Sequence, residues 1–381
     1  MSKPFYDKSF KLGVLGGGQL GKMLIQEAVN LNINVCVLEP FADAPCSKLA
    51  AEFTVGSITD YDTVYQFGKN KDIVTIEIEN VNIEALKQLQ KEGVKVFPSP
   101  EIIELIQDKG LQKEFYTQHN IPTAPYILVN NKKEVSEHLA KFPFAQKLRK
   151  GGYDGKGVQL LKSESDLSKA FDAPCVLEQL VDFEKELAVI VARNEQGEVA
   201  TFPVVEMEFN PDANLVEFLF SPADVSETIS NNAREIAVNV AKAFNLVGIL
   251  AVELFLLKDG SILVNECAPR PHNSGHQTIE GNYTSQYAQH LRSILNLPLG
   301  NTDIKLPSVM VNLLGEKGFS GAANYEGLEA CLQKEGVYIH LYGKTETKPF
   351  RKMGHVTIVH KDLEKAKENA YFVKRTLKCK A

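Results

Sequence analysis

Short apolar runs alternate with helix-like periodicity along the first third of the chain. Lys11–Leu15 and Asn34–Leu38 are apolar runs of strand length, and between them apolar side chains from Leu20 to Leu31 recur every three to four residues. Further strands are expected at Glu52–Val55, Ile73–Ile78 and Lys95–Phe97, with a helix at Ile83–Gln90. This alternation predicts a parallel sheet covered by helices.

The pattern changes after Pro98-Ser99-Pro100. A helix is expected over Glu101–Gln118, and the prolines of Ile121–Pro125 predict a rigid connector. The segment from about residue 126 to residue 177 then forms a small unit with a helix at Lys133–Lys141, a strand at Phe144–Leu148 and a glycine-rich loop. Its size and position are typical of an insertion or a lid.

The remainder of the chain predicts a larger mixed unit followed by a tail of short strands. Strands are expected at Leu187–Ala192, Val199–Val205, Ile249–Leu257, Ile262–Cys267, Ser308–Leu313, Tyr338–Leu341 and His355–Val359, and helices at Ala233–Phe244 and Leu363–Lys378. With 381 residues, the chain is long enough for two or three domains.

Composition narrows the classes of partner. The 42 basic and 48 acidic side chains give a formal net charge of −6, which provides no general attraction for nucleic acid or for an anionic membrane. The six cysteines include no C-x-x-C pair, so reduced thiols are expected rather than a disulfide framework or a zinc site. The N-terminus lacks the apolar stretch of a signal peptide, and no apolar run approaches the ~20 residues of a membrane span. A cytoplasmic protein without nucleic-acid or membrane partners is therefore expected.

A glycine-rich turn follows the first expected strand. Gly16, Gly18 and Gly21 form a G-x-G-x-x-G pattern, and Glu39 ends the next strand, where the ribose-binding acid of a dinucleotide site would lie. Glycines let the backbone approach an anion at a helix N-terminus. Taken alone, the pattern favours an NAD-dependent oxidoreductase, but the same turn also serves folds that bind no dinucleotide.

A second glycine-rich segment is strongly basic. Lys147–Gly157 holds four glycines and four cations directly after an expected strand, which places Lys147 on the strand itself. Backbone amides and lysines in such a hairpin can neutralise the oxygens of a triphosphate. The segment lacks the G-x-x-x-x-G-K-S/T pattern of a Walker loop, which disfavours an ordinary P-loop ATPase. The alternative is a solvated basic hairpin without a ligand.

Two glutamates are expected to face each other across a hairpin. Lys258-Asp259-Gly260 predicts a tight turn, so Glu253 and Glu266 lie opposite each other on neighbouring antiparallel strands. Like charges in this position are destabilising unless a cation neutralises them, and Mg²⁺ prefers carboxylate and phosphate oxygens. The alternative, a pair of surface glutamates, fits poorly with the apolar neighbours of Glu253.

The segment Ala268–His276 follows immediately and holds rigid prolines beside hydrogen-bond donors. Singly, His272 or His276 would be an ordinary hydrogen-bonded histidine. Next to the acidic pair, Arg270, His272 and Asn273 predict one wall of an active site.

These motifs, in this order, resemble the ATP-grasp superfamily. The strings G-G-G-Q-L-G (16–21), G-G-Y-D-G-K-G (151–157), N-E-C-A-P-R-P-H-N-S-G-H (265–276) and R-K-M-G-H (351–355) are similar to the 5-(carboxyamino)imidazole ribonucleotide synthetase family, and the likeness covers nearly the whole chain. The resemblance implies an α/β fold of the α+β ATP-grasp type with three parts. These are an N-terminal Rossmann-like parallel-sheet (preATP-grasp) domain at 1–108, a central ATP-grasp domain at 109–300 with a small lid at about 116–177, and a small β-rich C-terminal subdomain at 301–381.

The resemblance also implies an activity. A ligase of this family forms a C–N bond: it uses ATP and bicarbonate to carboxylate 5-aminoimidazole ribonucleotide through carboxyphosphate, in de novo purine biosynthesis. The implied cofactors are ATP and Mg²⁺, with Mn²⁺ as an alternative metal. The implied assembly is a homodimer whose product passes to a carboxyaminoimidazole ribonucleotide mutase. Because carboxyphosphate hydrolyses quickly, a closing lid that excludes water fits this chemistry.

Residue roles follow from the resemblance by position. The ATP-binding set is Lys109, Lys147, Gly152, Tyr153, Asp154, Gly155, Lys156, Gly157, Glu178, Gln179, Leu180, Val181, Glu186, Asn265 and Glu266, in which residues 178–181 are the adenine hinge and Glu186 binds the ribose. Magnesium would be held by Glu253, Asn265 and Glu266. The ribonucleotide would meet Gln19, Leu20, Glu79, His272, Asn273, Lys344, Lys348 and Arg351, and the catalytic groups would be Tyr153, Asp154, Lys156, Arg270 and His272. Phe209 stands where the family has a histidine, so the ATP contact often made there is either absent or made by another group.

Three alternatives remain open at this stage. A formate-dependent glycinamide ribonucleotide transformylase shares the superfamily and a similar acyl-phosphate chemistry. A non-catalytic nucleotide-binding subunit would need neither the acidic pair nor the basic loop. An NAD oxidoreductase gives no role to the segments after the first glycine turn.

Overall fold

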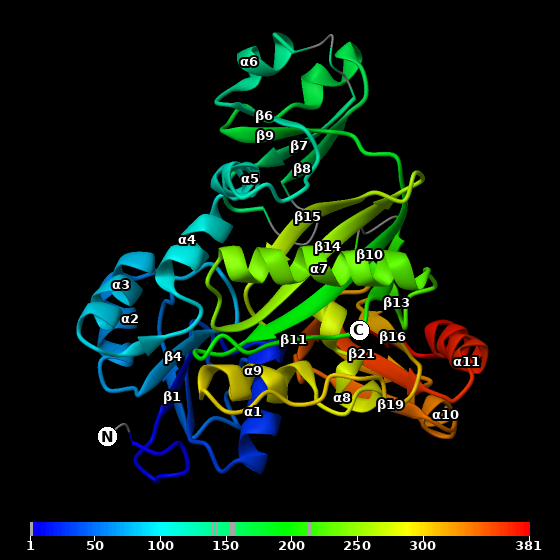
Figure 1. Cartoon of the computed structure of the whole chain (residues 1–381). Helices are drawn as coiled ribbons and strands as arrows, with labels where there is room; N and C mark the ends of the chain where they lie inside the picture. Colours follow the sequence, from blue (N-terminus) through cyan, green and yellow to red (C-terminus); the bar gives the residue numbers. More distant parts are fainter. Residues whose placement is uncertain (1–2, 139–140, 142, 153–156, 212–214) are drawn as a thin grey trace.

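The N-terminal part is a parallel sheet with helices, as the apolar pattern predicts. A computed structural model describes residues 3–138, 141, 143–152, 157–211 and 215–381 (Figure 1). The sheet has the order β3-β2-β1-β4-β5, from β1 Leu12–Leu15, β2 Val35–Glu39, β3 Glu52–Val55, β4 Ile73–Ile76 and β5 Lys95–Val96. Its helices are α1 Gln19–Asn30, α2 Tyr61–Gly68 and α3 Ile83–Lys91. Strands β1, β2 and β4 are buried along their length, which explains their unbroken apolar runs.

The helix expected over Glu101–Gln118 is in fact two helices. α4 spans Pro100–Gln107 and α5 spans Lys109–Gln118. Asp108 between them has extended backbone, and its carboxylate accepts hydrogen bonds from the N–H groups of Gly110 and Leu111 at 2.8 and 3.2 Å. The prediction of one helix was wrong because Asp108 acts as an N-cap. This break places Lys109 in the first turn of α5.

A small four-stranded sheet lies at the top of Figure 1, in the segment predicted to be a lid, and is called the lid sheet below. It has the order β6-β9-β7-β8, from β6 Tyr126–Val129, β7 Phe144–Leu148, β8 Val158–Leu161 and β9 Cys175–Gln179. α6 Lys132–Ser136 is shorter than the helix expected there, and a 3₁₀ helix (η2) covers Glu164–Lys169. Val129, Val135, Phe144 and Leu177 belong to a core of its own.

The central part is built on a nine-stranded sheet that includes the C-terminal strands. The order is β15-β14-β10-β12-β13-β16-β21-β19, with β11 paired to β10. The strands are β10 Phe183–Arg193, β11 Val199–Thr201, β12 Val205–Asn210, β13 Leu215–Ser221, β14 Gly248–Leu257, β15 Ile262–Ala268, β16 Ser308–Leu314, β19 Val337–Leu341 and β21 Lys352–Val359. The predicted C-terminal strands are therefore present, but they extend the central sheet instead of forming a separate one.

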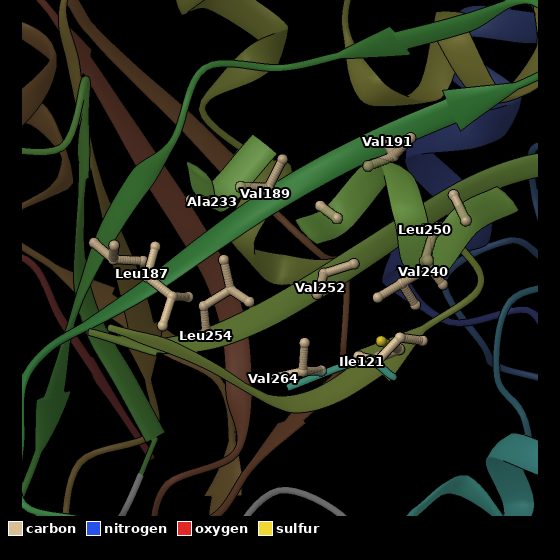
Figure 2. Close-up of a cluster of buried hydrophobic side chains, with 14 of the residues drawn as sticks. Ile121, Leu187, Val189, Val191, Ala233, Val240, Leu250, Val252, Leu254 and Val264 are labelled. Carbon is tan, nitrogen blue, oxygen red and sulfur yellow. The ribbon is translucent and has the colours of Figure 1, made fainter. Parts of the chain in front are cut away.

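Helix α7, Glu227–Ala243, covers one face of this sheet. Figure 2 shows the contact: Ala233 and Val240 of α7 lie among side chains of β10 and β14, including Val189 and Val252. All four side chains are fully buried. β14 and most of β10 are almost continuously apolar, and α7 closes the face that carries Val189 and Val252. Their neighbours along each strand point to the opposite face of the sheet.

Two local expectations in this part fail for identifiable reasons. The strand expected over Val199–Val205 is split into β11 and β12 around Pro203, which has no N–H to continue a strand ladder. α9, Gln286–Ile294, was not expected; it buries the polar residues Gln286, Gln289, His290 and Ser293, so the helical periodicity of apolar residues is weak there.

The remaining elements are short, apart from the helix near the C-terminus. They are η3 Asn273–Gly275, α8 Thr278–Gly281, β17 Gly321–Ala322, β18 Asn324–Glu326, α10 Leu328–Leu332, β20 Glu346–Thr347, α11 Leu363–Thr376 and β22 Lys378–Lys380. None of the helices in the described ranges is both long and apolar enough to span a membrane.

Candidate functional site

The two glutamates lie opposite each other, as the turn residues predict. Glu253 of β14 and Glu266 of β15 are register partners, and the strands are joined by the turn at Lys258–Gly260. Burial, together with the charge of Glu266, raises the pKa of Glu253 well above its ordinary value. The Lys109 ammonium holds the pKa of Glu266 well below its ordinary value. Lys109 provides one positive charge for two carboxylates. A second positive charge would be needed for both Glu253 and Glu266 to ionise at neutral pH.

Two lysines approach the acidic strand. Lys109 Nζ lies 2.6 Å from Glu266 Oε2, and Lys147 Nζ donates to Asn265 Oδ1 and to Glu178 Oε2, each at 3.0 Å. Lys147 comes from β7 of the lid sheet, whereas Asn265 and Glu266 come from β15. The structure thus brings together five predicted site residues that come from four separate segments of the sequence.

A cavity of about 410 Å³ opens beside the predicted adenine hinge. Its lining residues are Pro125, Gln179, Leu180, Val181, Asp182, Leu257, Lys258, Asp259 and Leu263. The N–H groups of Gln179 and Leu180 already donate to the carbonyls of Pro125 and Pro143, at 2.8 and 3.1 Å. Glu186 lies on β10 farther along, and burial raises its pKa to about 7. A cavity lined by Pro125, Leu180, Val181, Leu257 and Leu263 together with a few polar side chains suits a nucleoside.

The base of the basic loop is clamped to α5. Arg149 donates to both carboxylate oxygens of Asp108 at 2.8 and 2.9 Å, and the Lys109 N–H donates to the Arg149 carbonyl at 2.9 Å. Arg149 is therefore a structural cation, while Lys147 faces the acidic strand. Tyr153, Asp154, Gly155 and Lys156 lie outside the described residues. Gly152 and Gly157 are described and form the neck of the hairpin, where Gly157 has φ +79°.

The N-terminal glycine turn is filled by the chain's own carboxylates. Glu39 Oε2 accepts a hydrogen bond from the Gly17 N–H at 2.7 Å, and Glu77 Oε1 accepts from the Leu20 N–H at 3.1 Å. A Cβ on Gly18 would lie 2.6 Å from Glu77 Oε1. The anion position of a dinucleotide site is therefore taken, and the oxidoreductase reading of this turn is wrong.

Residues after β15 reach the N-terminal domain. Arg270 Nε lies 2.9 Å from Glu79 Oε1, and His272 Nε2 lies 3.8 Å from Glu253 Oε1. Asn273 exchanges two amide hydrogen bonds of 2.9 Å with Asn312 of β16. Gln19 and Leu20 open α1 close to Glu77. These predicted substrate residues therefore meet at the junction of the two large sheets.

Two of the cations predicted to bind the ribonucleotide phosphate donate hydrogen bonds to backbone carbonyls, and the third is exposed. Lys344 Nζ donates to the Lys352 carbonyl and Arg351 Nη1 donates to the Glu346 carbonyl, each at 2.7 Å, while Lys348 is exposed. Sequence reasoning missed Lys352, whose charge acts on Glu253. No alternation along β21 points to it, because the strand is buried continuously from Met353 to Val359. Phe209 is partly buried against the apolar side chains of β12 and β13.

Three further residues of the site were not predicted. Asp108 binds Arg149 at the base of the basic loop. Glu77 binds the Leu20 N–H at the glycine turn, and Lys113 pairs with Glu178 of the hinge. Only Asp108 carried a usable signal, since an acid directly before a cationic helix start is a common N-cap. In the described ranges, no group of three or more His, Cys, Asp or Glu side chains is arranged to hold a metal ion.

The sequence matches three family profiles that together span most of the chain. They are the ribonucleotide synthetase preATP-grasp domain at residues 10–107, the ATP-grasp domain at residues 114–287 and the phosphoribosylaminoimidazole carboxylase C-terminal domain at residues 308–369. The profile limits agree with the order of parts seen in the fold.

Individual proteins resemble the chain over its whole length. The N5-carboxyaminoimidazole ribonucleotide synthase of Bacillus subtilis is 38% identical over 366 residues, covering 94% of each chain. The crystal structure of the corresponding synthetase from Thermotoga maritima has a TM-score of 0.91 and 46% identity, covering 98% of this chain and 99% of that one. The Aspergillus clavatus synthase in complex with ADP and 5-aminoimidazole ribonucleotide has a TM-score of 0.87 and 36% identity, covering 96% and 98%.

Some relatives are longer. The chain spans 65% of the chloroplastic phosphoribosylaminoimidazole carboxylase of Vigna aconitifolia, with 39% identity. Those relatives therefore carry a further segment that this chain does not match.

Proposed function

The chain belongs to the N5-carboxyaminoimidazole ribonucleotide synthetase family of ATP-grasp ligases, and on this premise we propose that it uses ATP and bicarbonate to carboxylate 5-aminoimidazole ribonucleotide. The products are N5-carboxyaminoimidazole ribonucleotide, an intermediate of purine biosynthesis, with ADP and phosphate. One observation carries the proposal: β15 supplies Asn265 and Glu266 to the lysine cluster, and the chain directly after it supplies Arg270 and His272 to the junction with the N-terminal domain. A single strand end thus serves both a nucleotide and a second substrate.

The nucleotide would lie between the lid and the central sheet. The cavity at the hinge would take the adenine, and Glu186 would accept hydrogen bonds from the ribose hydroxyls. Lys109 and Lys147 would leave their carboxylate partners for phosphate oxygens, under the glycine-rich loop of residues 151–157. Roles for Tyr153, Asp154 and Lys156 in that loop are part of the proposal.

Magnesium fits the donor set. Glu253, Asn265 and Glu266 would hold it, because Mg²⁺ is usually bound through one or two carboxylates together with substrate phosphates. Glu253 and Glu266 face each other with Lys109 paired to Glu266 alone, and a divalent ion would let both carboxylates ionise, which supports a cation at this position. When bound, the ion would neutralise charge that develops on the transferred phosphoryl group.

The reaction balances in two steps. A bicarbonate oxygen attacks the γ-phosphorus and the bond to the ADP oxygen breaks, which gives carboxyphosphate. The exocyclic amine of the ribonucleotide then attacks the carboxyl carbon, the C–O bond to phosphate breaks and the amine loses a proton. Arg270 and His272 would hold the carboxyl group between the two sites; the contact of Arg270 with Glu79 and that of His272 with Glu253 support this role.

The ribonucleotide would occupy the junction of the two sheets. Gln19, Leu20 and Glu79 would meet its base and ribose, with Asn273 nearby. Lys344, Lys348 and Arg351 were predicted to hold its phosphate, and Lys352 joins them as a candidate because of its position near Glu253. The domain limits at residues 108 and 300, the homodimer, the transfer of product to a mutase and the cytoplasmic location stay predictions.

A substrate panel tests the function. Phosphate release from Mg-ATP should require both 5-aminoimidazole ribonucleotide and bicarbonate, and neither alone should stimulate it. The matched arm replaces these with glycinamide ribonucleotide and formate. Stimulation by that second pair, without stimulation by the first, would identify a transformylase instead.

A further inference from the structure

One buried cation has no part in the chemistry described above. Lys113 of α5 has an exposed fraction of 1%. Its ammonium donates to Thr123 Oγ1 at 2.6 Å and lies 3.3 Å from Glu178 Oε2. Thr123 in turn donates to the Val264 carbonyl of β15 at 2.8 Å. Lys113 is thus held on one side by Thr123, which is anchored to β15, and on the other by the hinge glutamate.

Glu178 is shared by two ammonium groups. Lys147 Nζ lies 3.0 Å and Lys113 Nζ lies 3.3 Å from the same oxygen, Glu178 Oε2. Glu178 is buried, with an exposed fraction of 4%. Burial opposes ionisation, but the two lysines together hold the pKa of Glu178 below its ordinary value. Burial in turn lowers the pKa of Lys113 to about 8, against the attraction of Glu178. The buried Glu178 carboxylate therefore stays ionised only because Lys147 and Lys113 lie next to it.

The two lysines differ in what they are free to do. Lys147 stands on the strand that leads into the basic loop and also contacts Asn265 in the predicted metal set. Lys113 is enclosed, and its second partner is a threonine hydroxyl that is itself anchored to β15. A phosphate that arrives from the lid side can draw Lys147 away from Glu178, but it leaves Lys113 in place.

The corresponding exchange at Glu266 works differently. There Lys109 is the cation at 2.6 Å, and a divalent ion that accompanies the nucleotide would take over its position when it leaves. Glu178 faces Lys147 and Lys113 and no metal-binding partner is assigned to it, so its replacement charge must already be in the protein.

We infer that Lys113 is a positioning residue that acts as a permanent counter-ion for Glu178 and thereby releases Lys147 to bind nucleotide phosphate. The inference rests on the proposed nucleotide site. Without Lys113, the buried Glu178 carboxylate would retain Lys147 as its only partner, and the phosphates would compete with it for the same ammonium. The loss should therefore affect phosphate binding and spare the nucleoside part.

The test measures ADP and adenosine dissociation constants by calorimetry, in the presence of Mg²⁺, for the whole chain and its variants. Lys113→Met removes the charge and keeps the length of the side chain; it should weaken ADP binding at least tenfold and change adenosine binding less than twofold. Lys185→Met is the matched control, because it removes a half-buried lysine paired with Glu206 at 2.9 Å on β10; it should leave both constants within twofold of the parent chain.

The second comparison removes the carboxylate. If Lys113 acts only by offsetting Glu178, then Glu178→Gln and the double variant Lys113→Met/Glu178→Gln should bind ADP with the same affinity, within about twofold. This comparison holds even if Lys113→Met alone fails to fold.

The inference would be overturned by an equal loss of ADP and adenosine binding in Lys113→Met, which indicates a purely structural role, or by a tenfold loss that persists in the Glu178→Gln background. Unchanged ADP binding in Lys113→Met would also overturn it. Failure of the proposed function is seen separately, as an absence of carboxylated product from the parent chain.

Discussion

Single side chains in the site are set by the charges around them. Glu253 and Glu266 have the same chemistry and face each other on one hairpin, yet burial raises the pKa of one and Lys109 lowers the pKa of the other. Arg149 comes from a loop rich in cations, but it is paired with Asp108 and has a structural role. A residue's type therefore predicts its chemistry only after its nearest charged partner is known.

Replacement of Glu266 by alanine should reduce turnover by about 100- to 1,000-fold, because the proposed magnesium ligand and the partner of Lys109 are lost together. The measurement is steady-state phosphate release over a Mg²⁺ titration, with the fold checked by circular dichroism. Glu235→Gln, at an exposed position of α7, is the control and should be neutral. Near-normal turnover in Glu266→Ala would remove the metal assignment.

Acid should destabilise the fold through buried histidines. Burial lowers the pKa of His290 to about 4, so the folded protein excludes a proton that the unfolded chain binds below its ordinary pKa of 6.5. The stability from this group is present above pH 6.5 and is lost as pH falls towards 4. One such histidine is worth about 2 kcal/mol between pH 7 and pH 5.

His290→Gln should therefore lose less free energy of unfolding than the parent chain between these two pH values, by about that amount. Urea titrations at both pH values measure it, with the exposed His119→Gln as control. An acid sensitivity identical to that of the parent would show that His290 does not contribute.

Elements with a local signal could be predicted, and those decided by distant contacts could not. The first strands and helices follow from apolar period, and the pairing of Glu253 with Glu266 follows from one tight turn. The break at Asp108 was missed because its apolar period continues across it. Lys113 and Glu77 gave no signal, since their partners are 65 and 57 positions away, at Glu178 and Leu20.

The neck of the glycine-rich hairpin should be sensitive to one methyl group. Gly151 and Gly157 have φ of +78° and +79°, so alanine costs a similar ~1–2 kcal/mol of backbone strain at either. Only at Gly157 would the new Cβ lie 3.0 Å from the Gly152 Cα; at Gly151 it would meet nothing within 4 Å.

Gly157→Ala should therefore raise the KM for ATP about tenfold more than Gly151→Ala, because its Cβ would also displace Gly152, in the loop proposed to cover the phosphates. Initial-rate kinetics of both variants measure the difference. Equal effects of the two variants would mean that the neck geometry does not matter for ATP.

At the scale of the whole molecule, the site exists because three parts of the chain meet at one strand end. The lid supplies Lys147, α5 supplies Lys109, and the loop after β15 carries Arg270 to Glu79 of the N-terminal domain (Figure 1). The C-terminal strands β16 and β21 continue the same sheet, which places Asn312 against Asn273. Local sequence patterns do not show which strands pair when they are so distant in sequence. The meeting of these parts was therefore predicted from the family resemblance and not from the apolar pattern.

Oxygen transfer from bicarbonate to phosphate tests the central claim most directly. If a bicarbonate oxygen attacks ATP and the carboxyl group is then passed to the amine, that oxygen must remain on phosphorus. Turnover with ¹⁸O-bicarbonate, Mg-ATP and 5-aminoimidazole ribonucleotide should yield inorganic phosphate that carries one ¹⁸O atom, detected by mass spectrometry. Unlabelled phosphate, produced at the same rate with or without bicarbonate, would show that water or another acid is phosphorylated and would contradict a carboxylating ligase.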